Sequence, residues 1–273
     1  AKAKLDLLDR SDAAILNGDD ANVVEGCAHW QGRKVFYTLQ TPKPGEIGLV
    51  EDLLVDRAFV EDPMEAAMFC ELSEVQPTAP HSVSNALAAA GLTRSIGIDH
   101  SVIRDAIKKF RPGRHRIETV LEQNGIRWID DSKATNPHAA QASLMSELSV
   151  VWIAGGLAKG AEMGDLIAQV GSRLRAVILI GADRELIAHE MQSRFPNVTL
   201  VRVDPEPGHD RSSADNTFMN QVVEQAKLLA EHGDAVLLAP ACASMDQFIS
   251  YGDRGDRFAK SVREIVGKND NAS

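Results

Sequence analysis

The sequence predicts an α/β protein: strands and helices in the first half, then a Rossmann-like domain whose mainly parallel sheet has helices on both faces. From Gly113 onward, short and nearly continuous apolar segments alternate with amphipathic segments of helical periodicity. This alternation is typical of parallel strands that are buried on both faces and connected by crossover helices. The predicted strands of this half span residues 127–130, 150–154, 176–180, 198–203 and 235–239.

Helical segments separate these predicted strands. The clearest has Phe218, Val222 and Ala226 on one face, with Gly233 just past its end. The predicted helices of this half span residues 137–148, 165–174, 185–195 and 215–231.

The first half has a weaker pattern. We expect strands at 13–16, 33–39 and 48–59, the last with the alternation of an antiparallel pair. We expect a helix end at 1–10, a short helix from Asp19 or Asp20 to Ala28, a helix from Pro80 that Gly91 stops, and a helix at 98–110 with Asp99 as its cap. The break at Phe110–Gly113 favours two domains, 1–110 and 111–273.

Composition excludes several classes of protein. The 273 residues are 44% hydrophobic and 25% charged, with a formal net charge of −10, which argues against nucleic-acid binding. The sequence contains no signal-peptide pattern and no apolar run that could span a membrane. Three separated cysteines, Cys27, Cys70 and Cys242, lack metal-site spacing and indicate free thiols in a reducing cytoplasm.

The segment Trp128–His138, W-I-D-D-S-K-A-T-N-P-H, concentrates short polar groups between a strand and a helix. Thr135 or Asn136 can serve as the N-cap, and Pro137 suits the first helical position. Such a segment is either a well-capped turn or the place where an α/β sheet presents its chemistry.

Two further loops follow predicted parallel strands, at 154–160 (A-G-G-L-A-K-G) and 240–244. Because ligands bind beyond the carboxyl ends of parallel strands, we expect these loops and 130–137 to share one edge of the sheet. Lys159 could bind a carboxylate or phosphate there, although the loop lacks the dinucleotide fingerprint. Ser244 begins a capping-box pattern, S-M-D-Q, so it either caps a helix or also binds an anion at that helix start.

Three strings carry a family resemblance: G-R-H-R at 113–116, D-S-K-A-T-N-P at 131–137 and A-P-A-C-A-S-M-D-Q-F at 239–248. Together they resemble the carboxyl-terminal part of a Mur ligase, and the resemblance covers nearly the whole chain. S-K-A-T-N points to the branch of the family that adds D-glutamate. The resemblance implies that residues 1–110 are the trailing part of a central ATPase domain and that 111–273 form the carboxyl-terminal, D-glutamate-binding domain.

The resemblance also implies roles for the nucleotide. Arg116 is similar to an arginine that contacts the ATP phosphates and takes part in catalysis, Asp131 to the carboxylate on the ribose, and Asn85 to an asparagine on the adenine. Lys4 matches a lysine that carries an N-carbamate, which as an oxygen ligand would suit Mg²⁺. Each has an ordinary alternative, such as a solvated lysine or a solvent-facing helix asparagine.

For the amino-acid substrate, the resemblance implies that Lys133 and Thr135 lie near the reacting groups, with Thr135 also binding substrate. Lys159, Ser244 and Tyr251 match the D-glutamate pocket, where Tyr251 stands in place of a common phenylalanine. His115 and His138 we interpret as ordinary polar residues.

The chain contains no G-x-x-x-x-G-K-[ST] phosphate loop, which such a ligase needs. We therefore expect a fragment without ligase activity of its own, derived from a monomeric cytoplasmic enzyme that uses ATP and Mg²⁺. The implied reaction joins D-glutamate to UDP-N-acetylmuramoyl-L-alanine in peptidoglycan precursor synthesis. Two alternatives stay open: another Mur-type or polyglutamate amide ligase, and a nonenzymatic nucleotide-binding module.

Overall fold

The chain is described here by a computed structural model that covers residues 6–62, 64–208 and 210–267. It divides into two compact units: the amino-terminal unit, residues 1–111, and the carboxyl-terminal unit, residues 112–273. The division lies within the break expected at Phe110–Gly113. Lys4 lies outside the described residues, as does the first half of the helix expected at 1–10. The remainder of that stretch includes the 3-10 helix η1 (Leu8–Arg10).

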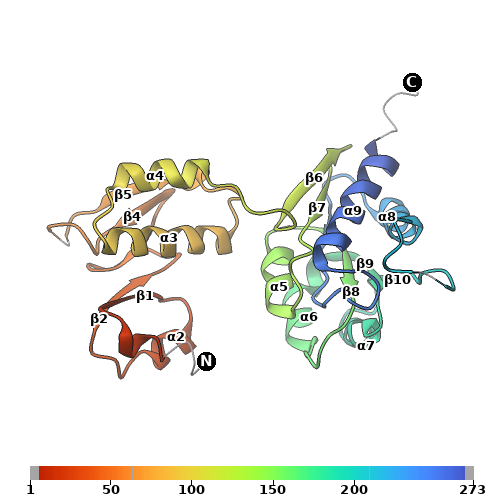
Figure 1. Ribbon diagram of the computed structural model, residues 1–273, viewed down its shortest axis with the longest axis horizontal. Helices are drawn as coiled ribbons and strands as arrows, with labels where there is room; N and C mark the ends of the chain where they lie inside the picture. The colour runs from red at the N-terminus through yellow and green to blue at the C-terminus, as the bar shows by residue number, and fades with distance from the viewer. Residues whose placement is uncertain (1–5, 63, 209, 268–273) are drawn as a thin grey trace. The chain divides into compact units, whose positions relative to one another are not determined.

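The amino-terminal unit contains a five-stranded sheet of order β1-β2-β3-β4-β5 (Figure 1). The first three strands run parallel, whereas β4 is antiparallel to both of its neighbours. The strands are β1 (Ala13–Asn17), β2 (Arg33–Tyr37), β3 (Ile47–Val50), β4 (Leu53–Asp56) and β5 (Ala67–Glu71). The segment predicted at 48–59 is therefore the β3–β4 hairpin, and β5 was not predicted.

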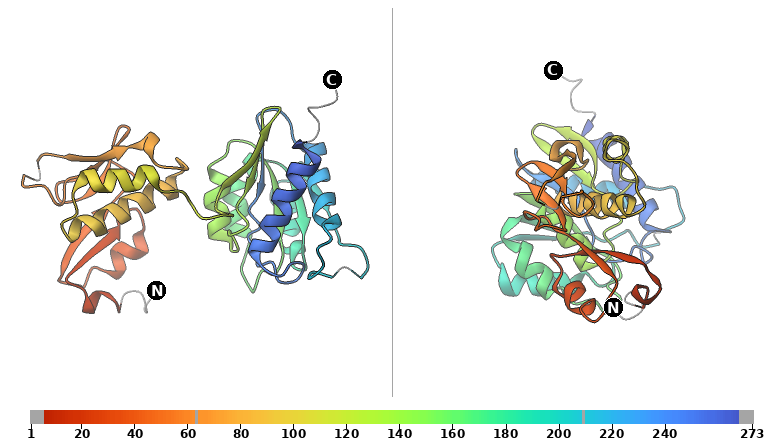
Figure 2. Two further views of the ribbon diagram at one scale, coloured as in Figure 1. Left: turned by 45° about the horizontal axis from the view of Figure 1, so that its top comes forward. Right: turned by 90° about the vertical axis from the view of Figure 1, so that its left-hand side faces the viewer.

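Helices cover this sheet on both faces. Helix α2 (Ala21–Gly26), capped by Asp20, belongs to the side where Ala14, Cys27 and Trp30 are buried. Helices α3 (Pro80–Ser95) and α4 (His100–Lys109) pack side by side on the other (Figure 2). The 3-10 helix η2 (Leu72–Glu74) follows β5.

The prediction that Gly91 stops α3 was wrong. The helix continues to Ser95, and Gly91 is buried in its interior. A Cβ at Gly91 would lie 2.8 Å from an Ile15 side-chain atom and 2.9 Å from one of Ile47. The glycine therefore allows close helix–sheet packing rather than terminating the helix.

The carboxyl-terminal unit contains a six-stranded sheet of order β10-β9-β8-β11-β7-β6, parallel except for the edge strand β6. The predicted α/β class and mainly parallel sheet are confirmed. The strands are β6 (Glu118–Gln123), β7 (Ile126–Asp130), β8 (Val150–Gly155), β9 (Leu174–Ile180), β10 (Thr199–Arg202) and β11 (Ala235–Leu238).

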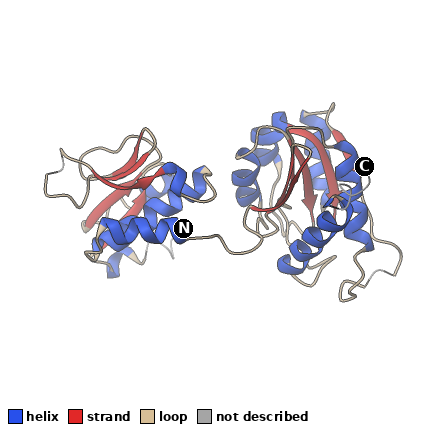
Figure 3. Cartoon of the chain, turned by 90° about the horizontal axis from the view of Figure 1, so that it is seen from above, coloured by secondary structure: helices blue, strands red, loops and turns tan. Residues whose placement is uncertain are grey.

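Helices cover both faces of this sheet (Figure 3). Along β8, Trp152 belongs to the core cluster under α5, α6 and α7, and Val151 to the cluster under α8 and α9. This strict alternation explains why the strands read as unbroken apolar runs. The helices are α5 (Pro137–Met145), α6 (Gly164–Val170), the 3-10 helix η3 (Gly171–Arg173), α7 (Arg184–Arg194), α8 (Thr217–Leu229) and α9 (Tyr251–Ile265).

Two details of this unit differ from expectation. The strand β6 pairs with β7 through a turn at Asn124–Gly125, both with positive φ, and was not predicted. The prediction of a capping box at Ser244 was wrong, because no helix begins at that residue. The next helix, α9, begins at Tyr251, and the Ser250 hydroxyl accepts the Asp253 N–H at its start. Among the described residues, no helix is long and apolar enough to span a membrane.

Candidate functional site

Three loops meet at the carboxyl ends of β7, β8 and β11, which are neighbours in the sheet. We call this edge the rim: loops 130–137, 154–160 and 240–244. Backbone hydrogen bonds join the loops, from Ala241 N to Ala134 O at 3.0 Å and from Leu157 N to Ala243 O at 2.8 Å. The structure therefore brings together the polar segments that the sequence places far apart.

A glycine permits the close approach of two of these loops. Gly156 has φ +131°, and a Cβ there would lie 2.1 Å from the Ala243 carbonyl oxygen. Beyond it, Lys159 is exposed at the loop tip with φ +54°. Asp183 supports this loop: its carboxylate accepts the Ala158 N–H at 2.8 Å, and its own N–H donates to Gly156 O at 3.0 Å.

Lys133 and Tyr251 form the polar centre of the rim. The Lys133 ammonium lies 3.8 Å from the centroid of the Tyr251 ring, a cation–π contact. Hydrogen bonding and Coulomb attraction from Lys133 lower the pKa of the Tyr251 hydroxyl. The neighbouring Ser132 hydroxyl donates to the Tyr251 carbonyl at 2.7 Å, which joins loop 130–137 to the start of α9.

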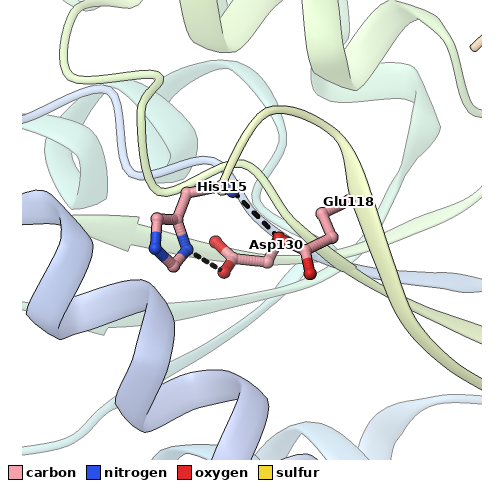
Figure 4. A group of neighbouring side chains, drawn as sticks. All are labelled: His115, Glu118 and Asp130. Carbon is pink, nitrogen blue, oxygen red and sulfur yellow. Dashed lines mark hydrogen bonds and ion pairs between the residues drawn. The ribbon is translucent and has the colours of Figure 1, made fainter. Parts of the chain in front are cut away.

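Behind the rim lies a buried histidine–carboxylate cluster (Figure 4). His115 Nδ1 is 2.7 Å from Asp130 Oδ2, and the Glu118 carboxylate accepts the backbone N–H of His115 at 3.0 Å. Burial raises the pKa of Asp130, and His115 opposes that shift. His115, interpreted from sequence as an ordinary polar residue, is thus a buried structural partner of the rim.

His115, Glu118 and Asp130 also lie close enough together to be considered as metal ligands. Asp130 Oδ1 accepts the Ser132 N–H at 2.9 Å, while its other oxygen and Glu118 hold His115. These hydrogen bonds account for the cluster without an ion.

Asp131 lies beside this cluster, only 7% exposed. It accepts hydrogen bonds from the Ser143 hydroxyl and the Ile117 N–H. Burial raises the pKa of Asp131 to about 6, and Coulomb repulsion from Asp130 adds to the shift while Arg116 opposes it. The carboxylate expected on the ATP ribose is therefore largely enclosed by protein.

The remaining predicted site residues differ in their placement. Arg116 is exposed beside His115, Thr135 is half-buried in loop 130–137, and Ser244 is buried at the rim. Asn85 is exposed on α3, which belongs to the amino-terminal unit, whereas the rim belongs to the carboxyl-terminal unit. The roles of these residues stay predictions.

Arg254 of α9 is a rim residue that the sequence reasoning missed. Its guanidinium contacts loops 130–137 and 240–244 and is fully buried. The sequence contained a signal for the burial of Arg254. The residue precedes the buried Phe258 and Val262 by four and eight positions, so it lies on the apolar face of the helix.

Comparison with known families agrees with this geometry. Residues 115–242 match the family model described as "Mur ligase, glutamate ligase domain". The carboxyl-terminal unit thus has the sequence of a Mur ligase glutamate ligase domain. The chain belongs to the Mur ligase family.

Two relatives are similar over most of this chain. The chain is 50% identical over 246 residues to the UDP-N-acetylmuramoylalanine–D-glutamate ligase of Streptomyces coelicolor, covering 90% of this chain and 50% of that protein. It is 50% identical over 234 residues to the ligase of the same name from Thermobifida fusca, covering 85% and 49%. The chain spans about half the length of these curated relatives.

Solved structures share the fold at low identity. A pseudomurein peptide ligase type C from Methanothermus fervidus has a TM-score of 0.66 at 15% identity, covering 97% of this chain and 59% of that one. A UDP-N-acetylmuramate–alanine ligase from Thermotoga maritima has a TM-score of 0.60 at 14% identity, covering 96% and 54%. At this identity the likeness shows the fold alone.

Proposed function

We propose that this chain is part of an ATP-dependent amide ligase that adds D-glutamate to UDP-N-acetylmuramoyl-L-alanine in peptidoglycan precursor synthesis. The observation that carries the proposal is the rim, where Lys133, Lys159 and Ser244 come from three loops at one end of a parallel sheet. An amino acid with two carboxylates would suit two lysines and a buried hydroxyl. The names of the relatives that are 50% identical support D-glutamate as that amino acid.

In the proposed reaction, the terminal carboxylate of the nucleotide substrate takes the γ-phosphoryl group of ATP, and ADP leaves. The amine of D-glutamate attacks the resulting acyl phosphate carbon, loses a proton, and expels inorganic phosphate. Lys159 and Ser244 would hold a D-glutamate carboxylate, with Tyr251 and Thr135 beside it. Lys133 and Arg116 would position and stabilise the negative charge that develops on the reacting groups.

ATP and Mg²⁺ fit this chain only in part. Arg116 is exposed and free to approach a phosphate, whereas Asp131 is largely enclosed. No G-x-x-x-x-G-K-[ST] phosphate-loop string is present in the sequence. Bound Mg²⁺ would neutralise phosphate charge, and Lys4, the residue proposed as its carbamate ligand, lies outside the described residues.

The substitution Lys159→Ala tests the proposal in the full-length gene product that carries these residues. Removal of one charged partner of the D-glutamate carboxylate should lower kcat/KM for D-glutamate by about 10- to 100-fold. Phosphate release from ATP is measured with UDP-N-acetylmuramoyl-L-alanine and either D-glutamate or L-glutamate. Lys260→Ala, which removes an exposed lysine of α9, serves as the control and should retain the wild-type value.

The alternatives give different results in the same assay. Phosphate release with an amino acid other than D-glutamate would identify another Mur-type or polyglutamate amide ligase. Failure of the wild-type protein to turn over ATP with any amino acid would favour the nonenzymatic nucleotide-binding module. Equal kinetics for Lys159→Ala and Lys260→Ala would remove Lys159 from the site.

A further inference from the structure

Arg254 makes a set of contacts that the proposed reaction does not use. The side chain is 0% exposed. Its Nε donates to the Ser132 hydroxyl at 2.9 Å and its Nη2 to the Ser132 carbonyl at 2.9 Å. Both terminal nitrogens also lie 3.3 Å from the Cys242 carbonyl oxygen. A single guanidinium thus bonds loop 130–137 and loop 240–244.

These contacts include no ion pair. Within the described parts of the chain, no carboxylate lies within ion-pair distance of Arg254, although Asp130 and Asp246 exert a longer-range attraction. A buried charge without an oppositely charged partner is costly, and an apolar side chain of similar volume is often neutral or stabilising at such a position. Burial lowers the pKa of Arg254 to about 10, so the group is charged at neutral pH. Stability alone is therefore a poor reason for an arginine here.

The two loops that Arg254 joins carry residues proposed to meet one substrate. Ser132 immediately precedes Lys133, and Cys242 stands two residues before Ser244. Ser132 is held from two sides, since its hydroxyl accepts from Arg254 and donates to the Tyr251 carbonyl. A movement of Arg254 would displace Lys133 relative to both Ser244 and Tyr251.

We infer that Arg254 is a positioning residue of the amino-acid site: it touches no substrate but sets the spacing between Lys133 and Ser244. This inference rests on the proposed function, because it assumes that both residues meet D-glutamate. The planar guanidinium can serve Ser132 and Cys242 together, whereas a lysine ammonium is a single point that lacks the fork.

The test compares Arg254→Lys with Arg257→Lys in the full-length gene product. Arg257 is a matched control on the same helix: it donates to the backbone carbonyls of Arg211, Ser213 and Asp215, in a loop without a proposed substrate residue. Arg254→Lys should raise KM for D-glutamate by about 10- to 100-fold, since a small misplacement of a binding group has effects of that size. KM for ATP should change less than about twofold in both variants.

A merely structural role would give another pattern. General loss of folded protein lowers kcat without a selective change in KM for D-glutamate, and that result would overturn the inference. Ser132→Ala provides a second variant with little change in volume: it removes one Arg254 contact together with the hydrogen bond to the Tyr251 carbonyl, and it should raise the same KM to a smaller extent. A Ser132→Ala enzyme with wild-type KM for D-glutamate would also contradict the inference. If the wild-type enzyme needs no D-glutamate, the proposed function fails instead.

Discussion

Asp131 shows how one buried carboxyl group at the rim makes the stability of the fold depend on pH. The carboxyl group is buried, its pKa is raised to about 6, and its charged neighbours are Asp130 and Arg116. A raised pKa means that the folded protein binds this proton more tightly than the unfolded chain does. The stabilising contribution is therefore complete below about pH 4 and is lost as the pH rises through about 6.

The variant Asp131→Asn should remove this pH dependence, because the amide cannot ionise. Relative to the variant, the wild-type chain should lose up to about 3 kcal/mol of unfolding free energy between about pH 4 and pH 7. Urea unfolding monitored by tryptophan fluorescence measures it, since Trp128 and Trp152 are buried in the same unit. A difference between the two proteins that does not vary with pH would show that the Asp131 pKa is not raised.

At the scale of elements, helix α9 contacts two of the three rim loops, 130–137 and 240–244. Its first residue contacts Lys133, and Arg254 bonds two loops. Gly255 lies against the His115–Asp130 pair: a Cβ there would be 2.2 Å from His115 Nδ1 and 2.6 Å from Asp130 Oδ2. The helix therefore rests directly on the buried cluster that supports loop 130–137.

Gly255→Ala should destabilise the protein even though alanine favours helices. The new methyl group must separate the buried pair or displace α9, and such overpacking costs about 1–3 kcal/mol. Gly252→Ala is the control, because its Cβ would meet only Ser250 Oγ at 3.5 Å and His115 Nε2 at 3.9 Å. That variant should be neutral or stabilised by up to about 1 kcal/mol. Thermal unfolding of both decides the matter, and equal melting temperatures would refute the proposed packing.

At the scale of the whole molecule, the two units have separate cores. The clusters on the two faces of the six-stranded sheet contain residues of the carboxyl-terminal unit, and the clusters around β1–β5 contain residues of the amino-terminal unit. Each sheet therefore has its own apolar core, which is the property that allows a domain to fold by itself.

Residues 112–273 expressed alone should consequently fold and unfold cooperatively. The melting temperature reported by Trp128 and Trp152 fluorescence should match that of the same tryptophans in the full chain, with Trp30→Phe introduced there to remove the tryptophan of the other unit. Loss of near-ultraviolet circular dichroism in the isolated segment would indicate that its core depends on the first 111 residues.

Several features followed from the sequence alone, for local reasons. Apolar runs such as Val150–Gly155 predicted buried parallel strands. Asp99 was predicted as a cap and Asp20 was one of two candidates, because such side chains accept hydrogen bonds from nearby backbone N–H groups. The rule for carboxyl ends of parallel strands also predicted that the three loops would meet. The Asn124–Gly125 turn was a readable hairpin signal, so β6 could have been predicted as well.

Other features depended on contacts between residues distant in sequence. His115 looks like an ordinary loop residue until the chain brings Asp130 beside it, and Ser244 resembles a helix cap although α9 begins at Tyr251. Local propensity could identify the strands, the helices and the polar loops, because those depend on neighbours in the chain. Only the tertiary structure decided which polar groups are buried together. The Arg254 guanidinium, for example, donates to the backbone carbonyls of Ser132 and Cys242, which are distant in sequence and lie beside it only in the folded chain.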